Sequence, residues 1–280
     1  MVPRDIVENY KGNIIQHGLY NDRIYLIKLA SEVPRTFPGE LIEVAEKKGY
    51  SKIFAKVPEC QADVFSTAGF KEEARIPGFY DGKTAAVFTV FYLNDKRAKE
   101  SEISRLEEIL RIALDKNVDY SPRQPADELS LRICNEADVG AMADIYRTVF
   151  PSYPFPIHDS DYIKETMNSH VDYFGIETNG QLVAISSAEM DKQSSNVEMT
   201  DFATLSEYRG NGFAQLLLSR MEYEMKANGL KTAYTIARAM SVGMNVTFKK
   251  SGYQFGGRLK NNTNISGQIE SMNVWYKRIG

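Results

Sequence analysis

The second half of the chain alternates between apolar patterns typical of helices and apolar patterns typical of strands. Phe213, Leu217, Met221 and Met225 fall four residues apart, which predicts an amphipathic helix that ends near Gly229. Strands are expected at residues 129–134, 171–178, 181–190, 197–205, 232–237, 253–259 and 270–277, and further helices after Asn135, at 161–169 and at 242–250. This order predicts an α/β fold with a mixed sheet and helices on both faces.

The composition of two connections between these elements predicts their type. Asn179-Gly180 joins the strands 171–178 and 181–190, and this dipeptide is a strong signal for a two-residue hairpin. The segment between the last two strands is rich in glycine and asparagine, so we expect a loop there.

The first 115 residues contain a fainter version of the same order. A helix at 41–49 and a strand at 52–57 resemble the pair at 216–229 and 232–237, and residues 65–70 mirror residues 248–253. A strand pair at 71–75 and 85–93 completes the parallel. We therefore expect a smaller N-terminal domain at 1–115 that is a worn half of the second, a polar, proline-broken linker at 116–128, and a second domain at 129–280.

Composition and charge narrow the function classes. A chain of 280 residues with 43% hydrophobic residues fits two globular domains, and a net charge of −3 without basic runs argues against nucleic-acid partners. We expect no signal peptide, no membrane helix and a cytoplasmic location, because no long apolar run is present. The isolated cysteines and the histidines at 17, 158 and 170 have no ligand spacing, so no metal is expected. The oligomeric state is left open.

The segment Arg209-Gly210-Asn211-Gly212-Phe213-Ala214 joins a predicted strand to a predicted helix. Glycines allow a tight turn and close backbone approach, and the first N–H groups of a helix attract anions. The segment therefore suits a pyrophosphate, although two glycines alone also fit an ordinary strand–helix turn. It lacks the lysine of a Walker A loop and the third glycine of a Rossmann fingerprint.

This string resembles the Arg/Gln-x-x-Gly-x-Gly/Ala signature of the GNAT acetyltransferases. Residues 245–253 are similar to the family's helix that ends in Gly-Phe or Gly-Tyr. The resemblance implies a GNAT fold for residues 129–280, preceded by a smaller, degenerate GNAT-like domain, and acetyl-CoA as co-substrate. It implies further that the backbone of Arg209, Gly210, Asn211, Gly212, Phe213 and Ala214 holds the pyrophosphate.

The resemblance also assigns residues to the rest of the cofactor. Phe202, Ala203 and Thr204 are expected to pair with the pantetheine arm, where the two central strands splay apart. Asn245 stands where the family often has a polar group near the cofactor, but helix capping is an equal alternative.

Acetyl transfer requires a neutral amine, so the site must remove a proton from a group with an ordinary pKa of about 10.4. Glu198 is the expected base, acting through water, with Asp201 and Glu189 as rivals; alternatively these carboxylates only attract a cation. Many family members have a tyrosine as general acid where this chain has Phe248. Tyr253 or water could substitute, and a thiolate is a tolerable leaving group without an acid.

Over its whole length the chain resembles the archaeal and bacillar β-lysine N6-acetyltransferases, which make the compatible solute Nε-acetyl-β-lysine. The strings at 74–82 and 237–245 carry this resemblance. Asp81, Asp201 and Glu189 could hold the remote ammonium, and Arg75 or Arg238 could clamp the carboxylate. Tyr80 and Asp81 would line the substrate site, although Phe79-Tyr80-Asp81-Gly82 also fits a plain turn.

Two alternatives remain open at this point. The substrate could be another small amine, such as a polyamine or lysine, or a protein lysine or N-terminus. The chain could also be a non-catalytic acyl-CoA-binding module, for which Phe248 is the best support.

Overall fold

The computed structural model describes residues 4–31, 33–119 and 129–280, and its strands form a continuous mixed sheet of 13 strands. The predicted α/β fold is confirmed. The N-terminal elements are β1 (Ile6–Tyr10), β2 (Asn13–Gly18), β3 (Arg23–Lys28), α1 (Phe37–Lys48), β4 (Lys52–Pro58), α2 (Ala62–Thr67), β5 (Lys71–Tyr80), β6 (Thr84–Tyr92), α3 (Asp95–Ala98) and α4 (Ile103–Leu114).

The C-terminal elements follow the predicted order. They are β7 (Leu129–Ile133), α5 (Val139–Val149), α6 (Ser160–Met167), β8 (Val171–Thr178), β9 (Gln181–Asp191), β10 (Asn196–Thr204), α7 (Phe213–Ala227), β11 (Thr232–Arg238), α8 (Val242–Lys250), β12 (Gln254–Ile265) and β13 (Gln268–Arg278). Among the described residues, every helix is too short or too polar to cross a bilayer.

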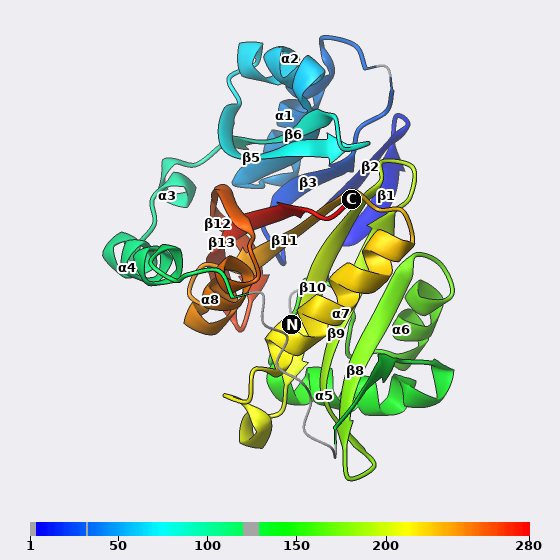
Figure 1. Cartoon of the computed structure of the whole chain (residues 1–280). Coiled ribbons are helices and arrows are strands. Elements are labelled where there is room, and N and C mark those ends of the chain that lie inside the picture. The colour runs from blue at the N-terminus through cyan, green and yellow to red at the C-terminus, as the bar shows by residue number, and fades with distance from the viewer. Residues whose placement is uncertain (1–3, 32, 120–128) are drawn as a thin grey trace.

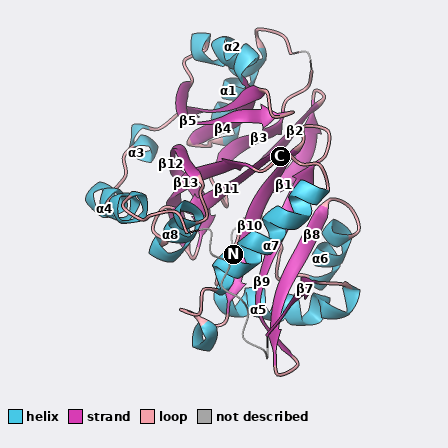
Figure 2. Cartoon of the chain, viewed as in Figure 1, coloured by secondary structure: helices cyan, strands magenta, loops and turns pink. Residues whose placement is uncertain are grey.

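Helices cover both faces of the C-terminal part of the sheet (Figure 2). Neighbouring side chains of β8 point to opposite faces, as the pleat requires. Phe174 packs into a cluster with residues of α7, whereas Tyr173 packs with residues of α5 and α6. The sheet is therefore the middle layer of three, and its central strands carry buried side chains on both faces.

The strand order of the N-terminal half repeats that of the C-terminal half. The sheet runs β1-β2-β3-β4-β6-β5-β12-β13-β11-β10-β9-β8-β7. Outward from the middle, β5-β6-β4-β3-β2-β1 corresponds strand by strand to β12-β13-β11-β10-β9-β8, and β7 is an additional strand at the C-terminal edge. In each half a helix joins two parallel strands, β3 to β4 through α1 and β10 to β11 through α7. Figure 1 shows the blue-to-cyan half joined to the green-to-red half through this sheet.

The two halves meet at corresponding strands. Ala74 of β5 pairs with Gly257 of β12, and each is the fourth residue of its strand. A Cβ atom on Gly257 would lie 2.2 Å from the Glu73 carbonyl oxygen and 2.6 Å from the Ala74 Cα atom. Only glycine allows the two backbones to approach so closely.

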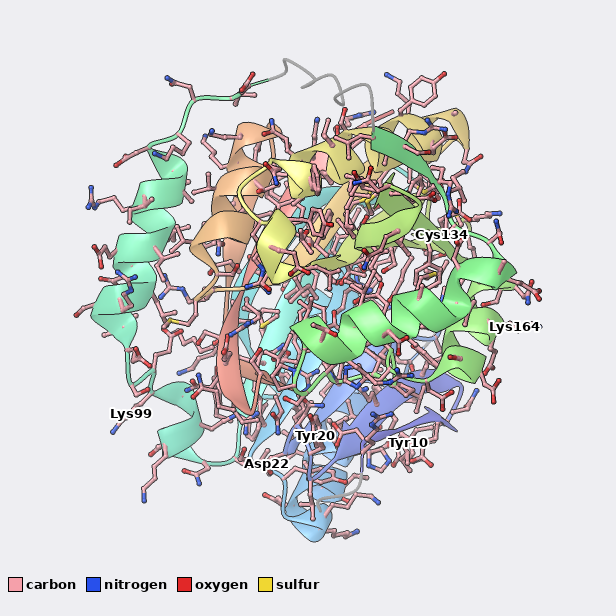
Figure 3. The ribbon with its side chains drawn as sticks, turned by 90° about the horizontal axis from the view of Figure 1, so that it is seen from below. Tyr10, Tyr20, Asp22, Lys99, Cys134 and Lys164 are labelled. Carbon is pink, nitrogen blue, oxygen red and sulfur yellow. The ribbon has the colours of Figure 1, made fainter. Side chains whose placement is uncertain are left out.

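Helix α4 belongs spatially to the C-terminal half. It lies beside α8 (Figures 1 and 3), and Ala113 is buried in the same cluster as residues of α7 and α8. The division of the chain into 1–115, a linker and 129–280 stays a prediction, and residues 120–128 of that linker lie outside the described residues.

One predicted loop is wrong. Residues 260–265 continue β12, because asparagines there bond to the N-terminal half as well as to β13. The Asn264 N–H donates to Asn21 Oδ1 at 2.7 Å, and the Asn264 side chain donates to the Tyr20 carbonyl at 2.8 Å. Tyr20 and Asp22, labelled in Figure 3, mark this turn before β3.

Candidate active site

A cavity of about 940 Å³ is lined by residues of both halves. The C-terminal half contributes residues of β9, β10, β11, α7 and α8, together with the segment before α6. The N-terminal half contributes side chains of β3 and β4, among them Arg23, Tyr25, Phe54 and Lys56. The cavity therefore reaches from the loop before α7 to the face of the smaller half.

The central strands β10 and β11 separate within this cavity. Their parallel pairing covers only Asn196, Val197 and Glu198, and Glu198 pairs with Tyr234. Beyond that pair a bulge interrupts β10 at Asp201, whose φ of +54° places it in the left-handed region. Such a bulge turns a strand away from its neighbour, so an open strand edge faces the cavity.

The three residues predicted to pair with the pantetheine arm follow this bulge. Phe202 and Thr204 line the cavity, but Ala203 does not and packs into the core beneath. Only backbone groups of Ala203 could take part in pairing.

The loop before α7 forms an anion cradle. Gly210 and Gly212 have φ values of +86° and +78°, and Gly212 caps the N-terminus of α7. Among the described residues, the backbone N–H groups of residues 210–214 donate to no protein acceptor. Arg209, Gly210, Gly212, Phe213 and Ala214 line the cavity. Asn211 does not, and its side chain donates to the Tyr208 carbonyl at 3.0 Å.

The side chain of Asn245 bonds to the backbone before α8 and to two side chains of β13, so few of its hydrogen-bonding groups remain for a cofactor. It is 0% exposed and does not line the cavity. Its amide donates to the carbonyls of Arg238 (3.0 Å) and Ser241 (2.7 Å). Its Oδ1 accepts from Asn273 Nδ2 at 2.8 Å and from Trp275 Nε1 at 2.9 Å. These bonds fill the side chain's capacity. They do not make Asn245 a helix cap, because it lies inside α8 and Ser241 caps that helix.

Glu189 and Glu198 are directly opposite each other on β9 and β10, and both line the cavity. Burial raises the pKa of Glu198, while the Lys56 ammonium and the Tyr234 hydroxyl oppose that rise. Burial raises the pKa of Glu189 well above its usual value, and the negative charges of Glu198 and Asp201 raise it further. The pair thus forms a desolvated anionic site that favours a cation.

Asp201 also lines the cavity, but its carboxylate is already engaged. Ser187 donates to Oδ2 at 2.6 Å, Thr200 donates to Oδ1 at 3.3 Å, and the Tyr153 hydroxyl donates to Oδ1 as well. Burial raises the pKa of Asp201, and these hydroxyls oppose the rise. The Glu198 carboxylate accepts from the Tyr234 hydroxyl and the Ile236 backbone, so it is engaged by fewer donors than Asp201 and is better placed to accept a proton.

Lys56 was not expected from the sequence. It is half-buried, its Nζ lies 3.4 Å from the Tyr234 hydroxyl, and it sits over the rings of Phe79 and Tyr234. Burial lowers the pKa of Lys56, and the charge of Glu198 is the largest effect opposing this. The sequence signal was the alternation of Lys52, Phe54 and Lys56 on one face of a strand.

Phe248 lines the cavity in place of the family's tyrosine. Its ring contacts Phe202 edge-on at a centroid distance of 5.7 Å and Tyr253 at 5.1 Å. Tyr253 does not line the cavity, so the proposed substitution of Tyr253 as general acid has no support from its position.

Other candidate substrate residues are dispersed. Arg238 lines the cavity, but it is bound bidentately by Glu270 at 2.7 and 2.9 Å. Arg75 pairs with Glu72 at 2.8 Å and also with Glu59, away from the cavity.

Tyr80 and Asp81 do not line the cavity either. Asp81 has a φ of +53°, and its side chain accepts from Ser195 at 3.0 Å. This arrangement matches the plain-turn alternative, in which the hairpin docks on the turn between β9 and β10.

Comparison with known proteins gives a consistent assignment. A model of the acetyltransferase (GNAT) family matches residues 140–244. A β-lysine N(6)-acetyltransferase of Methanococcus maripaludis is 44% identical over 95% of this chain and 96% of its own length. The β-lysine N(6)-acetyltransferase of Methanosarcina mazei is 32% identical over 86% of this chain and 96% of its own length.

A third relative, the N-acetyltransferase YodP of Bacillus subtilis, is 29% identical over 95% of this chain and 96% of its own length. These matches span both halves of the chain, including the smaller half that the family model leaves unmatched. The resemblance seen in the sequence is confirmed: the chain belongs to the acetyltransferase (GNAT) family.

Proposed function

We propose that this N-acetyltransferase transfers the acetyl group of acetyl-CoA to the side-chain amine of β-lysine, giving the compatible solute Nε-acetyl-β-lysine. Two relatives that carry this activity in their names support the proposal over nearly the whole chain. The observation that carries it is the continuity of the cavity, which joins the anion cradle at 209–214 to the Glu189–Glu198 pair.

The cofactor would bind along β10 and the start of α7. The N–H groups of residues 210–214, which meet no acceptor within the described part of the protein, and the helix dipole suit the pyrophosphate. The open edge of β10 after Glu198 suits the pantetheine arm, which would take the place of a neighbouring strand. The acetyl group would then lie near the point where β10 and β11 separate.

The amine would bind between Glu189 and Glu198. The raised pKa of Glu198 makes it a stronger base than an exposed glutamate, and it would take one proton from the ammonium, directly or through a water. The neutral nitrogen then attacks the thioester carbonyl, so that a C–N bond forms and the C–S bond breaks. Coenzyme A leaves as a thiolate, and the nitrogen loses its second proton to this thiolate, directly or through a water, as the amide forms. The leaving sulfur needs no tyrosine at position 248, because a thiol has an ordinary pKa of about 8.5 and its thiolate is a tolerable leaving group.

The test is an amine panel. Purified protein, acetyl-CoA and one of β-lysine, lysine, ornithine or spermidine are mixed, CoA release is followed, and products are identified by mass. Preferential release with β-lysine, acetylated on its terminal nitrogen, supports the proposal. Preference for another amine overturns the substrate assignment, and no release with any amine despite acetyl-CoA binding overturns the reaction.

A further inference from the structure

We propose that Arg23 and Asn262 form the site that recognises the amino-acid head of the substrate. Arg23 would bind the carboxylate, and Asn262 Oδ1 would accept a hydrogen bond from the ammonium on carbon 3. This inference rests on the proposed function, because it assumes an amine substrate that also carries a carboxylate.

Arg23 is a buried cation with no anionic partner in the described part of the chain. It is 3% exposed, it lines the cavity, and among the described residues no carboxylate lies within ion-pair distance. Its Nη1 donates to Thr263 Oγ1 at 3.2 Å and to the Asn262 carbonyl, but its buried Nε finds no acceptor in residues 4–31, 33–119 and 129–280. Burial lowers the pKa of Arg23 to about 10, so it remains protonated at neutral pH.

Neighbouring buried cations are compensated. Arg97 pairs with Asp22 at 3.3 Å and donates to two backbone carbonyls, and Lys52 lies 3.6 Å from Glu73. A buried charge that lacks such a partner is costly, and a ligand of opposite charge relieves that cost. Arg23 therefore points to an anionic ligand group inside the cavity.

Asn262, next to Arg23, has a second buried polar atom whose hydrogen-bonding capacity is unused among the described residues. It is 1% exposed, it lines the cavity, and its buried Oδ1 has no donor in the part of the chain that the structure describes. A buried acceptor without a donor also costs free energy. In β-lysine the carbon that carries the second ammonium is two bonds from the carboxylate carbon. A cation that binds the carboxylate, next to an acceptor that binds the ammonium, therefore suits this end of the molecule.

The cavity as a whole is therefore dipolar. Glu189 and Glu198 form its anionic region, and Arg23 forms its cationic region. Tyr25 lies between them: Arg23 is 5.4 Å from its ring, and the negative charge of Glu198 helps burial to raise its pKa. A linear molecule with a carboxylate at one end and an ammonium at the other matches this polarity. A polyamine would place a cation against Arg23.

Two β-lysine analogues separate the parts of the head. The molecule 6-aminohexanoate lacks the ammonium on carbon 3, and 1,4-diaminopentane lacks the carboxylate. For Arg23→Gln we expect kcat/KM to fall about 100-fold with β-lysine and 6-aminohexanoate, mainly through KM, because the carboxylate loses a buried ionic partner. The affinity for acetyl-CoA and the kcat/KM for 1,4-diaminopentane should stay within about threefold of wild type.

Asn262→Leu should show the complementary pattern. The value of kcat/KM falls about tenfold with β-lysine and 1,4-diaminopentane, and 6-aminohexanoate is unaffected. Arg23→Lys should recover part of the loss, and Arg105→Gln, which removes an exposed arginine of α4, should change none of these values.

The outcomes distinguish this inference from the proposed function. If wild-type protein acetylates neither β-lysine nor 6-aminohexanoate, the proposed function fails and the head site with it. If wild-type protein acetylates β-lysine and Arg23→Gln retains its KM, only the head site is overturned. An equal loss with all three amines, or a parallel loss of acetyl-CoA affinity, would mean that Arg23 is structural and would also overturn the head site.

Discussion

Glu198 of β10 stands directly opposite Glu189 of β9, on the same face of the sheet and inside the cavity. Like charges in this position destabilise an antiparallel pair. The arrangement therefore destabilises the protein without ligand, and a bound ammonium ion removes this destabilisation. The free-energy difference between the two states favours binding of an amine.

Glu198→Gln tests the base. We expect kcat with β-lysine to fall about 100-fold or more, because the amide cannot accept the ammonium proton. The affinity for acetyl-CoA, measured by calorimetry, should not change. Glu107→Gln, at an exposed position of α4, is the control for a general effect of charge. Retention of wild-type kcat by Glu198→Gln would assign the proton transfer to another group.

Glu189→Gln should stabilise the protein at neutral pH. The pKa of Glu189 is raised on folding, so above its usual value of 4.5 the folded chain binds more protons than the unfolded chain. Stability therefore falls as pH rises through this window, and the glutamine variant lacks that loss. In urea unfolding the variant should exceed wild type at pH 7 and match it near pH 4. Equal stability at both values would contradict the raised pKa.

Gly210→Asn tests the anion cradle. Asparagine tolerates a left-handed φ, and a Cβ atom at Gly210 meets nothing within 4 Å, so the fold should be retained. The side chain would crowd the pyrophosphate, and we expect acetyl-CoA to bind about tenfold more weakly, a loss of about 1.4 kcal/mol.

Gly180→Asn is the matched control for Gly210→Asn. Gly180 also has a positive φ and open space around its Cβ position, but it lies in the β8–β9 hairpin away from the cavity. Calorimetry on both variants should show weaker binding only for Gly210→Asn. A valine at Gly212 would be a poorer probe, because its branched side chain is strained at a φ of +78°.

Asn245→Ala should affect stability rather than cofactor binding. The substitution removes the acceptor of two buried donors, Trp275 Nε1 and Asn273 Nδ2. It also removes the side-chain donor to the carbonyls of Arg238 and Ser241, each of which keeps a backbone donor. We expect a loss of about 2–4 kcal/mol in the free energy of unfolding. The Kd for acetyl-CoA, measured below the unfolding transition, should be unchanged. A weaker Kd with normal stability would instead support the cofactor role.

The C-terminal half could be predicted closely because its signals are local. The four-residue spacing from Phe213 to Met225 and the Asn179-Gly180 hairpin define elements without reference to distant residues. The loop at 209–214 was recognisable for the same reason. Its glycines and the helix that follows are contiguous in the sequence.

The substrate side of the cavity depends on contacts between the halves. Strands β1 to β3 were not predicted, and with them Arg23 and Tyr25 were missed. The placement of Arg23 beside Asn262 requires β12 to extend past Leu259, which in turn requires bonds to Tyr20 and Asn21. No periodicity within one half reports such a pairing.

The pairing of Ala74 with Gly257 has a consequence for any attempt to shorten the protein. Each half alone would present β5 or β12 as an unpaired edge strand, and exposed edges invite pairing with other chains. Residues 129–280 alone would also lose α4, which covers part of their core. We expect such a fragment to self-associate and to lack the activity of the whole chain. By pairing with β12, the smaller half therefore also protects the larger half from aggregation.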